Sequence, residues 1–403
     1  MTDSPSVAKP PPRFAHLDGI RGLAALYVAA FHCYQMQLLV SPEIDPARAW
    51  LFKILKPLCM GHYAVAVFIV LSGYCLMLPI AKTGGAYTLR DGWAGYLQRR
   101  ARRILPAFYA AVLLTLALFP LTRAAWAAIG ADGRTDVRSV IAGTESSALV
   151  PQFLSHLVLC NNGVPVNDEL LVKFSNNTPM WSVATEGQIY FLFPLLLLPI
   201  LRRFGPWIAV SSGIAVGALL SSAFEGRYQL ACPWMLGVFA IGMFGALVSC
   251  SPEAIFGRLR KEVPWGALGA VILVCFATIG TVRLGFYRRN LLVVDTVLGI
   301  GIMSCLVAMS QISAGRGSRF GQWCVGVLSS RPAHLLGGCS YSLYLIHYPL
   351  LVLFQAYLLR VFSSLVMVDV AMLVPVMGAI VGLAYVFSLM FERPFMRAVG
   401  RGR

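Results

Sequence analysis

Charged residues are scarce in this chain. Asp, Glu, Lys and Arg make up 12% of its 403 residues, whereas hydrophobic residues make up 58%. A soluble globular domain carries about 25% charged residues. The composition therefore argues against a soluble domain. It predicts an all-α, polytopic integral membrane protein, because long apolar segments cross a bilayer as helices. If the source is bacterial, we expect the protein in the cytoplasmic (inner) membrane.

Several familiar catalytic and metal-binding motifs are missing. The sequence contains no GxSxG elbow, no HxxxxD pair, no HExxH helix and no Walker loop. Their absence argues against a serine hydrolase, a zincin and a P-loop ATPase. The 10 cysteines form no CxxC pair and no Cys/His metal spacing. Most of them lie inside apolar runs, where cysteine acts as a small buried residue. We therefore expect no bound metal and no permanently bound cofactor.

Basic residues, in contrast, are in excess. The formal net charge is +16. The basic residues cluster in short loops between apolar runs, where the positive-inside rule and an anionic ligand explain them better than nucleic acid does. About two-thirds of them fall on the cytoplasmic side if the N-terminus is inside, so we expect both termini in the cytoplasm. The expected partners are the lipid bilayer and an anion, and the oligomeric state stays open.

Apolar runs of about 20 residues, the length that a membrane span needs, occur about ten times. They lie at 18–40, 61–81, 103–121, 180–201, 206–223, 229–249, 265–282, 291–311, 335–358 and 366–391. We assign them to one membrane domain, 15–396, between a disordered cytoplasmic tail at 1–14 and a basic cytoplasmic tail at 397–403. The longest connection is an outer loop at about 122–179, and loops of that length are usually functional or disordered. Within it, we expect the short apolar segment 151–160 to be re-entrant or interfacial.

The first span carries three residues that are costly in a bilayer, Asp18, Arg21 and His32. Arg21 and His32 are eleven residues apart, close to three helical turns, so they share a helix face about 16 Å apart along the axis. Ionisable residues within a span usually face a bundle interior or a water-filled cavity. This spacing favours His32 as a base near the middle of the membrane. The alternative is a buried histidine held by one hydrogen bond, with Arg21 as an interfacial anchor.

The third span begins with four arginines in the stretch RRARRILP, namely Arg99, Arg100, Arg102 and Arg103. Arg100 and Arg103 would share a helix face, and arginine forks suit phosphate groups. The cluster is therefore a candidate clamp for a phosphate-bearing cytosolic donor such as coenzyme A. A topological anchor that contacts lipid headgroups is the alternative.

A carboxylate enters a later apolar run. Glu186 lies one turn after Ser182 and one turn before Tyr190, so these three side chains share a stripe, with Trp181 nearby. A carboxylate in this position is expected to be paired with a basic group or protonated. A structural ion pair is the alternative to a functional role.

Two further groups of polar residues lie within spans. Tyr341, Tyr344 and His347 are spaced by three residues, so they either line a polar cavity or form an internal hydrogen-bond network. Ser72 and Gly73 lie in mid-span, where small residues permit close helix packing. A base-like histidine, cytoplasmic arginines and an acid that faces the bundle together suit proton abstraction from an acceptor and a donor from the cytosol.

Six blocks occur along the chain in the order DGIRGLAALYVAAFH, VFIVLSGY, RRARRILP, MWSVATEGQIYFLFPLL, YSLYLIHYPL and FERPF. In the same order they resemble the blocks of the acyltransferase-3 family, over about 15–395. The members of that family are membrane acyltransferases that move acyl groups, often acetyl from acetyl-CoA, onto hydroxyls of sugars, other carbohydrates or natural products. The resemblance therefore implies a membrane-bound, acyl-CoA-dependent O-acyltransferase that acts on a sugar, a glycan or a glycosylated small molecule.

The resemblance also implies roles for single residues. His32 would be the catalytic histidine, Arg21 the basic partner in its motif and Asp18 the acidic position before that arginine. Arg100 and Arg103 would match the Arg-x-x-Arg pair that contacts the acyl-CoA.

Glu186 matches the glutamate of the family's Trp-Ser…Glu block. One departure is Gly187, where many members carry a second acidic residue, so a paired-carboxylate role is in doubt there. The candidate catalytic residues are thus His32, Arg21, Asp18 and Glu186. The candidate acceptor-binding residues are Trp181, Ser182, Tyr190, Tyr344 and His347.

The expected reaction is O-acyl transfer. Acyl-CoA, expected to be acetyl-CoA, would dock at the four arginines. His32, with a reference pKa near ~6.5, would take the proton of the acceptor hydroxyl as general base. Direct transfer and an acyl-enzyme both stay open, as do the acyl group and the acceptor. Two rival functions are a secondary transporter that uses the polar residues as a proton relay and a membrane assembly protein, although the sequence has no internal symmetry of the kind found in transporters.

Overall fold

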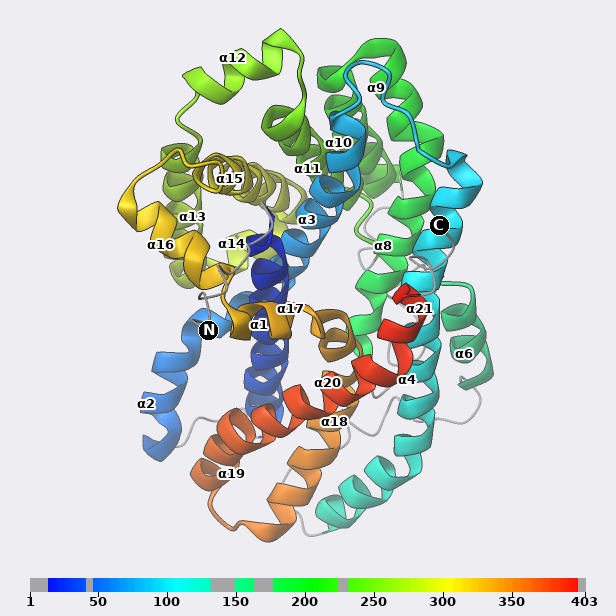
Figure 1. The fold of residues 1–403 in the computed structure, drawn as a ribbon. Coiled ribbons are helices and arrows are strands. Elements are labelled where there is room, and N and C mark those ends of the chain that lie inside the picture. The colour runs from blue at the N-terminus through cyan, green and yellow to red at the C-terminus, as the bar shows by residue number, and fades with distance from the viewer. Residues whose placement is uncertain (1–13, 41–45, 132–148, 163–176, 224–230, 398–403) are drawn as a thin grey trace, which may run out of the picture.

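The computed structural model describes residues 14–40, 46–131, 149–162, 177–223 and 231–397. Among these residues there are helices, turns and short connections, and no strand. Figure 1 shows the helices gathered around α1 and α3. The first half of the chain forms α1 (His16–Val40), α2 (Pro46–Leu55), η1 (Lys56–Met60), α3 (Gly61–Ala81), α4 (Gly92–Ala131), α6 (Leu149–Leu157), η4 (Thr178–Met180), α8 (Trp181–Leu192), η5 (Phe193–Leu197), α9 (Leu198–Phe204) and α10 (Pro206–Ala223). The second half forms α11 (Met235–Cys250), α12 (Ala254–Glu262), α13 (Trp265–Val282), α14 (Leu284–Arg289), α15 (Leu291–Ile312), α16 (Arg319–Leu328), α17 (Arg331–Gly337), α18 (Ser340–Val361), α19 (Leu365–Ala371), η7 (Met372–Val376), α20 (Met377–Phe391) and α21 (Arg393–Arg397).

Seven helical stretches in the described part are long and apolar enough to cross a membrane. They are Pro46–Ala81, Gly92–Ile129, Thr178–Phe204, Pro206–Ala223, Leu291–Ile312, Ser340–Val361 and Leu365–Phe391. An eighth is counted if α11 and α12, which meet at a bend of 93°, form one span. The chain is therefore an all-helical, multi-pass membrane protein, as its composition predicts.

These seven or eight stretches are fewer than the roughly ten spans that the sequence predicts. Each predicted span nevertheless coincides with helical residues. The apolar part of α13, Trp265–Gly280, is shorter than the seven spanning stretches. Helix α1 is long enough, with 25 residues, but its polar residues, among them Asp18, Arg21 and His32, lower its hydropathy. The cytoplasmic placement of both termini stays a prediction.

Helix α4 is longer than the sequence indicates. It has 40 residues and contains Pro106 and Pro120. In a membrane bundle, neighbouring groups can satisfy the backbone carbonyls that a proline leaves unpaired, so proline does not have to end the helix. The outer loop predicted from about 122 therefore begins only after Ala131. Residues 132–148 and 163–176 of that loop lie outside the described residues, and the short helix α6 lies between them.

Helix α3 packs closely against α11 through two glycines. A Cβ atom on Gly73 would lie 2.1 Å from the carbonyl oxygen of Phe239, and one on Gly242 would lie 2.2 Å from the carbonyl oxygen of Val70. Real Cβ atoms do not approach so closely, so both positions need glycine. The packing role predicted for Ser72 and Gly73 therefore applies to Gly73, and it fixes the position of Ser72 in the bundle.

Glycines also hold the start of α1 against α17, which crosses the N-terminal part of α1 in Figure 1. A Cβ atom on Gly22 would lie 2.7 Å from the backbone nitrogen of Gly337, and one on Gly337 would lie 2.2 Å from the carbonyl oxygen of Asp18. This contact fixes the position of the turn of α1 that carries Arg21.

Candidate active site

A cavity of about 70 Å³ lies between α1, α3, α4, α8 and α18. We call it the arginine cavity. Its lining includes Arg21, Ser72, Cys75, Arg100, Arg103, Ser182, Glu186, Tyr190, Tyr341 and Tyr344. Seven of the predicted site residues are among these, so side chains from four distant parts of the sequence meet in one place.

Asp18 holds Arg21 from outside this cavity. The Arg21 Nη1 and Asp18 Oδ1 atoms are 3.4 Å apart, and the Arg21 Nη2 atom is 3.7 Å from Cys75 Sγ. Asp18 also lies 3.4 Å from His334 Nδ1 of α17, and its side chain is 40% exposed. The structure therefore gives Asp18 a positioning contact with Arg21 at the rim.

Glu186 accepts hydrogen bonds from two hydroxyl groups. Ser72 Oγ donates to Glu186 Oε1 at 2.6 Å, and Tyr190 Oη donates to the same oxygen. The Tyr190 and Ser72 oxygens are themselves 3.0 Å apart. The sequence predicted a basic partner or a protonated carboxyl, and Glu186 does share the cavity with three arginines. Ser72 was not among the candidate site residues, because the sequence favoured a structural role for a mid-span serine next to a glycine, although a hydroxyl there can also bond across helices.

The four arginines of the RRARR stretch separate into two groups. Arg100 and Arg103 line the arginine cavity. The Nε atom of Arg100 is buried and has no hydrogen-bond partner within the described residues. Arg99 instead contacts Asp91, and the side chain of Arg102 is exposed. The predicted clamp of four arginines thus reduces to Arg100 and Arg103 at the cavity, since α4 turns the other two side chains away.

A second cavity of about 210 Å³ contains His32. We call it the histidine cavity. It is lined by Val28, Phe31, His32, Gly61, His62, Val65, Trp181, Cys232, Leu291 and Tyr344. The Nδ1 atom of His32 lies 3.2 Å from the side-chain oxygen of Gln35, so a neutral ring that donates there has its lone pair on Nε2.

His347 supports the ring of His32 from behind. The two ring centroids are 5.3 Å apart. His347 Nδ1 donates to the carbonyl oxygens of Leu343 and Tyr344, at 3.1 and 2.7 Å, and the residue is fully buried. His347, predicted as an acceptor-binding residue, therefore lies behind His32 and is not part of the cavity lining.

The two cavities adjoin each other, because Val65 and Tyr344 line both. The Tyr344 hydroxyl donates to the carbonyl oxygen of Pro179 at 2.9 Å and lies 2.5 Å from Ser182 Oγ. Arg21 and His32, which share a face of α1, thus face two neighbouring cavities at different depths.

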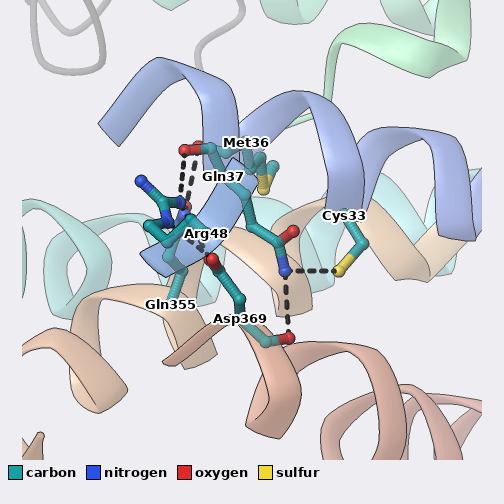
Figure 2. Close-up of polar contacts among 6 residues, drawn as sticks. All are labelled: Cys33, Met36, Gln37, Arg48, Gln355 and Asp369. Atoms are coloured by element: carbon teal, nitrogen blue, oxygen red, sulfur yellow. Dashed lines mark hydrogen bonds and ion pairs between the residues drawn. The ribbon is translucent and has the colours of Figure 1, made fainter. Parts of the chain in front are cut away.

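A buried ion pair fixes the end of α1 beyond His32, as Figure 2 shows. Arg48 of α2 makes two hydrogen bonds to Asp369 of α19, from Nε at 2.6 Å and from Nη2 at 3.0 Å. Arg48 also donates to the carbonyl oxygen of Gln37, and the Gln37 side chain donates to the carbonyl oxygen of Asp369. The pair therefore ties α2 and α19 to the turn of α1 that follows His32.

The sequence interpretation missed Arg48, Asp369 and a second buried acid, Asp295. The signal was available, because a lone acid in a run such as LLVVDTVLG is costly in a bilayer and indicates a partner. Among the described residues, no three His, Cys, Asp or Glu side chains are grouped so that they could hold a metal ion.

Comparison with known proteins identifies a family whose model matches most of the chain. Residues 14–391 match the acyltransferase-3 model, described as an acyltransferase domain. The O-acetyltransferase OatA of Staphylococcus aureus is 23% identical over 358 residues, which are 85% of this chain and 51% of that protein. The peptidoglycan O-acetyltransferase OatA of Listeria monocytogenes is 23% identical over 84% of this chain and 49% of its own length. The acyltransferase MdmB of Streptomyces mycarofaciens is 25% identical over 54% of this chain and 49% of its own length.

The chain thus spans about half the length of the curated relatives that it matches. No solved structure matches it. The family model nevertheless covers nearly the whole chain, from before α1 to the end of α20, and the cavities lie within that region. The chain belongs to the acyltransferase-3 family.

Proposed function

We propose that this membrane protein transfers an acetyl group from acetyl-CoA to a hydroxyl group of a sugar in a glycan or glycoconjugate. The observation that carries the proposal is that the arginine cavity and the histidine cavity share Val65 and Tyr344 in their linings. A phosphate-bearing donor in the first cavity would bring its thioester to a histidine base in the second. The names of the relatives, O-acetyltransferase and peptidoglycan O-acetyltransferase, support this chemistry and a carbohydrate acceptor.

The charge of the arginine cavity suits an anionic donor. Three arginines line it together with one carboxylate, Glu186, and Glu186 is already engaged by two hydroxyl groups. Arg100 and Arg103 supply the forks for phosphate oxygens, and the unpartnered Nε of Arg100 is a donor that such an oxygen would satisfy. Arg21, held by Asp18, adds a third positive charge.

His32 supplies the base. Its Nε2 lone pair takes the proton of the acceptor hydroxyl as that oxygen attacks the thioester carbonyl carbon. A carbon–oxygen bond forms and the carbon–sulfur bond breaks. The departing thiolate then recovers the proton from the His32 imidazolium, which returns the ring to its neutral state. The products are the O-acetyl ester and free CoA.

The test uses membranes from cells that express the chain and membranes from cells that lack it. Both are incubated with radiolabelled acetyl-CoA, and label in the glycan fraction is measured before and after mild base, which cleaves O-acetyl esters. The proposal predicts base-labile glycan label that depends on the chain. Solute uptake that needs no acetyl-CoA, without any glycan label, would contradict the enzyme and favour a transporter.

A further inference from the structure

A second histidine, His62, lies in the first turn of α3 and lines the histidine cavity with His32. Its Nε2 atom is 3.0 Å from Oδ2 of Asp295, a residue of α15. The same carboxylate oxygen accepts a hydrogen bond from Trp234 Nε1 at 2.8 Å. The reaction proposed above gives none of these three residues a task.

Burial makes the Asp295 carboxylate dependent on its hydrogen-bond partners. Asp295 is 0% exposed, and a carboxylate in such a place is costly unless it is paired and hydrogen-bonded. Within the described part of the chain, His62 is the one basic side chain that contacts the Asp295 carboxylate. The carboxylate therefore holds the hydrogen of His62 on Nε2. A neutral imidazole fixed in this tautomer has its lone pair on Nδ1.

The pair is reachable from the cavity. The His62 side chain is 26% exposed, although its partner Asp295 is fully buried. The His62 ring stacks on the Trp181 indole, with ring centroids 6.0 Å apart and planes only 11° from parallel. Trp181 lines the same cavity. One wall of the cavity thus contains two parallel aromatic rings, one of which carries a fixed hydrogen-bond acceptor.

A sugar ring has the complementary chemistry. Its C–H groups form an apolar face that can lie on an indole, and its hydroxyl groups point outward as donors. Aromatic residues with a polar edge are suited to such mixed surfaces, and binding pockets combine apolar walls with a few placed polar groups that fix orientation.

We propose that the Trp181–His62 wall is the acceptor-binding surface and that the Asp295–His62 pair orients the acceptor. The indole carries the face of one sugar ring, and His62 Nδ1 accepts a hydrogen bond from a hydroxyl of that ring. His32, in the same cavity, acts on the reacting hydroxyl. This inference rests on the proposed acetyl transfer, since it assigns the acceptor half of that site.

Two variants of His62 separate binding from structure. In His62→Gln, the amide nitrogen can occupy the place of Nε2 and keep the bond to Asp295, but no acceptor remains at the place of Nδ1. In His62→Asn, the amide oxygen lies near the place of Nδ1, but the bond to Asp295 is lost. A purely structural pair predicts that Gln preserves activity better than Asn does, whereas acceptor binding predicts the reverse order.

The measurements use the whole chain in native membranes. Acetyl-CoA binding, the rate of base-labile glycan labelling and the unfolding temperature are compared for wild type, His62→Gln, His62→Asn and Arg100→Ala. For His62→Gln, we expect wild-type acetyl-CoA affinity within about twofold and labelling reduced at least about tenfold, the effect of losing one buried hydrogen bond to a substrate. His62→Asn should label faster than His62→Gln.

Two results would overturn the inference. One is labelling by His62→Gln at the wild-type rate, or faster than labelling by His62→Asn, which would make the His62–Asp295 contact purely structural. The other is a loss of acetyl-CoA affinity in His62→Gln as large as the loss in Arg100→Ala. His62 would then contribute to binding of the donor and not of the acceptor. Failure of the proposed function is distinguishable from both, because wild-type membranes would then show no acetyl-CoA-dependent glycan label at all.

Discussion

The hydroxyl oxygens of Ser182 and Tyr344 lie 2.5 Å apart, and Tyr344 lines both the arginine cavity and the histidine cavity. Helix α8 supplies the serine and α18 supplies the tyrosine, so one hydrogen bond joins the two helices where donor and acceptor would meet. A change at this position should affect the transfer step more than the binding of either substrate.

Tyr344→Phe removes the hydroxyl and keeps the ring. We expect the rate of glycan labelling to fall about tenfold, because Ser182 loses a buried partner and the wall between the cavities loosens. The KM for acetyl-CoA should change little. Tyr385→Phe on α20 is the matched control, since that residue lies outside both cavities, and it should behave as wild type. Equal effects of the two substitutions would contradict the role given to Tyr344.

Arg100→Ala and Arg103→Ala test the donor site. Each removes one charged fork, and hydrogen bonds to charged groups contribute about 1.5–3 kcal/mol, so the KM for acetyl-CoA should rise about 10- to 100-fold. Arg102→Ala removes an exposed arginine of the same helix and should leave the KM unchanged. The measurement is the KM in membranes at fixed ionic strength. An equal rise in all three variants would indicate a general effect of surface charge.

Asp369→Asn tests the buried ion pair at the end of α1. Breaking one partner of a buried pair leaves an uncompensated charge, here on Arg48, at a cost of about 3–5 kcal/mol. We expect a clearly lower unfolding temperature in detergent and reduced glycan labelling, because the turn after His32 loses its anchor. Asp91→Asn is the control, since its pair with Arg99 is half-exposed and such pairs contribute about 0–1 kcal/mol. Equal unfolding temperatures for the two variants would refute the anchoring role.

Gly73→Ala tests the close approach of α3 and α11. The added Cβ would overlap the carbonyl oxygen of Phe239, so the helices must separate and the yield of folded protein should fall. Gly378→Ala, on α20, meets no atom within 4 Å and should be tolerated. Yield and unfolding temperature in detergent measure the difference. A stable Gly73→Ala protein with wild-type activity would show that α3 and α11 pack less closely than the structure indicates.

Helical periodicity anticipated much of the candidate site. Ser182, Glu186 and Tyr190 were expected on one stripe, and all three line the arginine cavity. Arg21 and His32 were expected on one face of α1, and both point into cavities. These relationships lie within single helices, where spacing alone determines the face. The all-helical membrane architecture and the family were likewise confirmed.

Contacts between distant helices could not be predicted in this way. Asp295 contacts His62, which is 233 residues away in the sequence, and Asp369 contacts Arg48, which is 321 residues away. A lone acid in an apolar run indicates that a partner exists but does not say which residue it is. The sequence did place Arg100 and Arg103 on one helix face, and both line the cavity, but it could not show that Arg99 contacts Asp91 instead.

The two adjoining cavities are proposed to form one acyl-transfer site with His32 as its base. The most direct test of this proposal is His32→Ala in native membranes. His156→Gln on α6, outside both cavities, is the histidine control. Acetyl-CoA affinity and base-labile glycan labelling are measured together. If His32 is the general base, its loss should leave the affinity within about twofold and reduce labelling by about 10²–10⁴-fold, the range of general-base catalysis. Glycan labelling by His32→Ala at the wild-type rate would contradict the account.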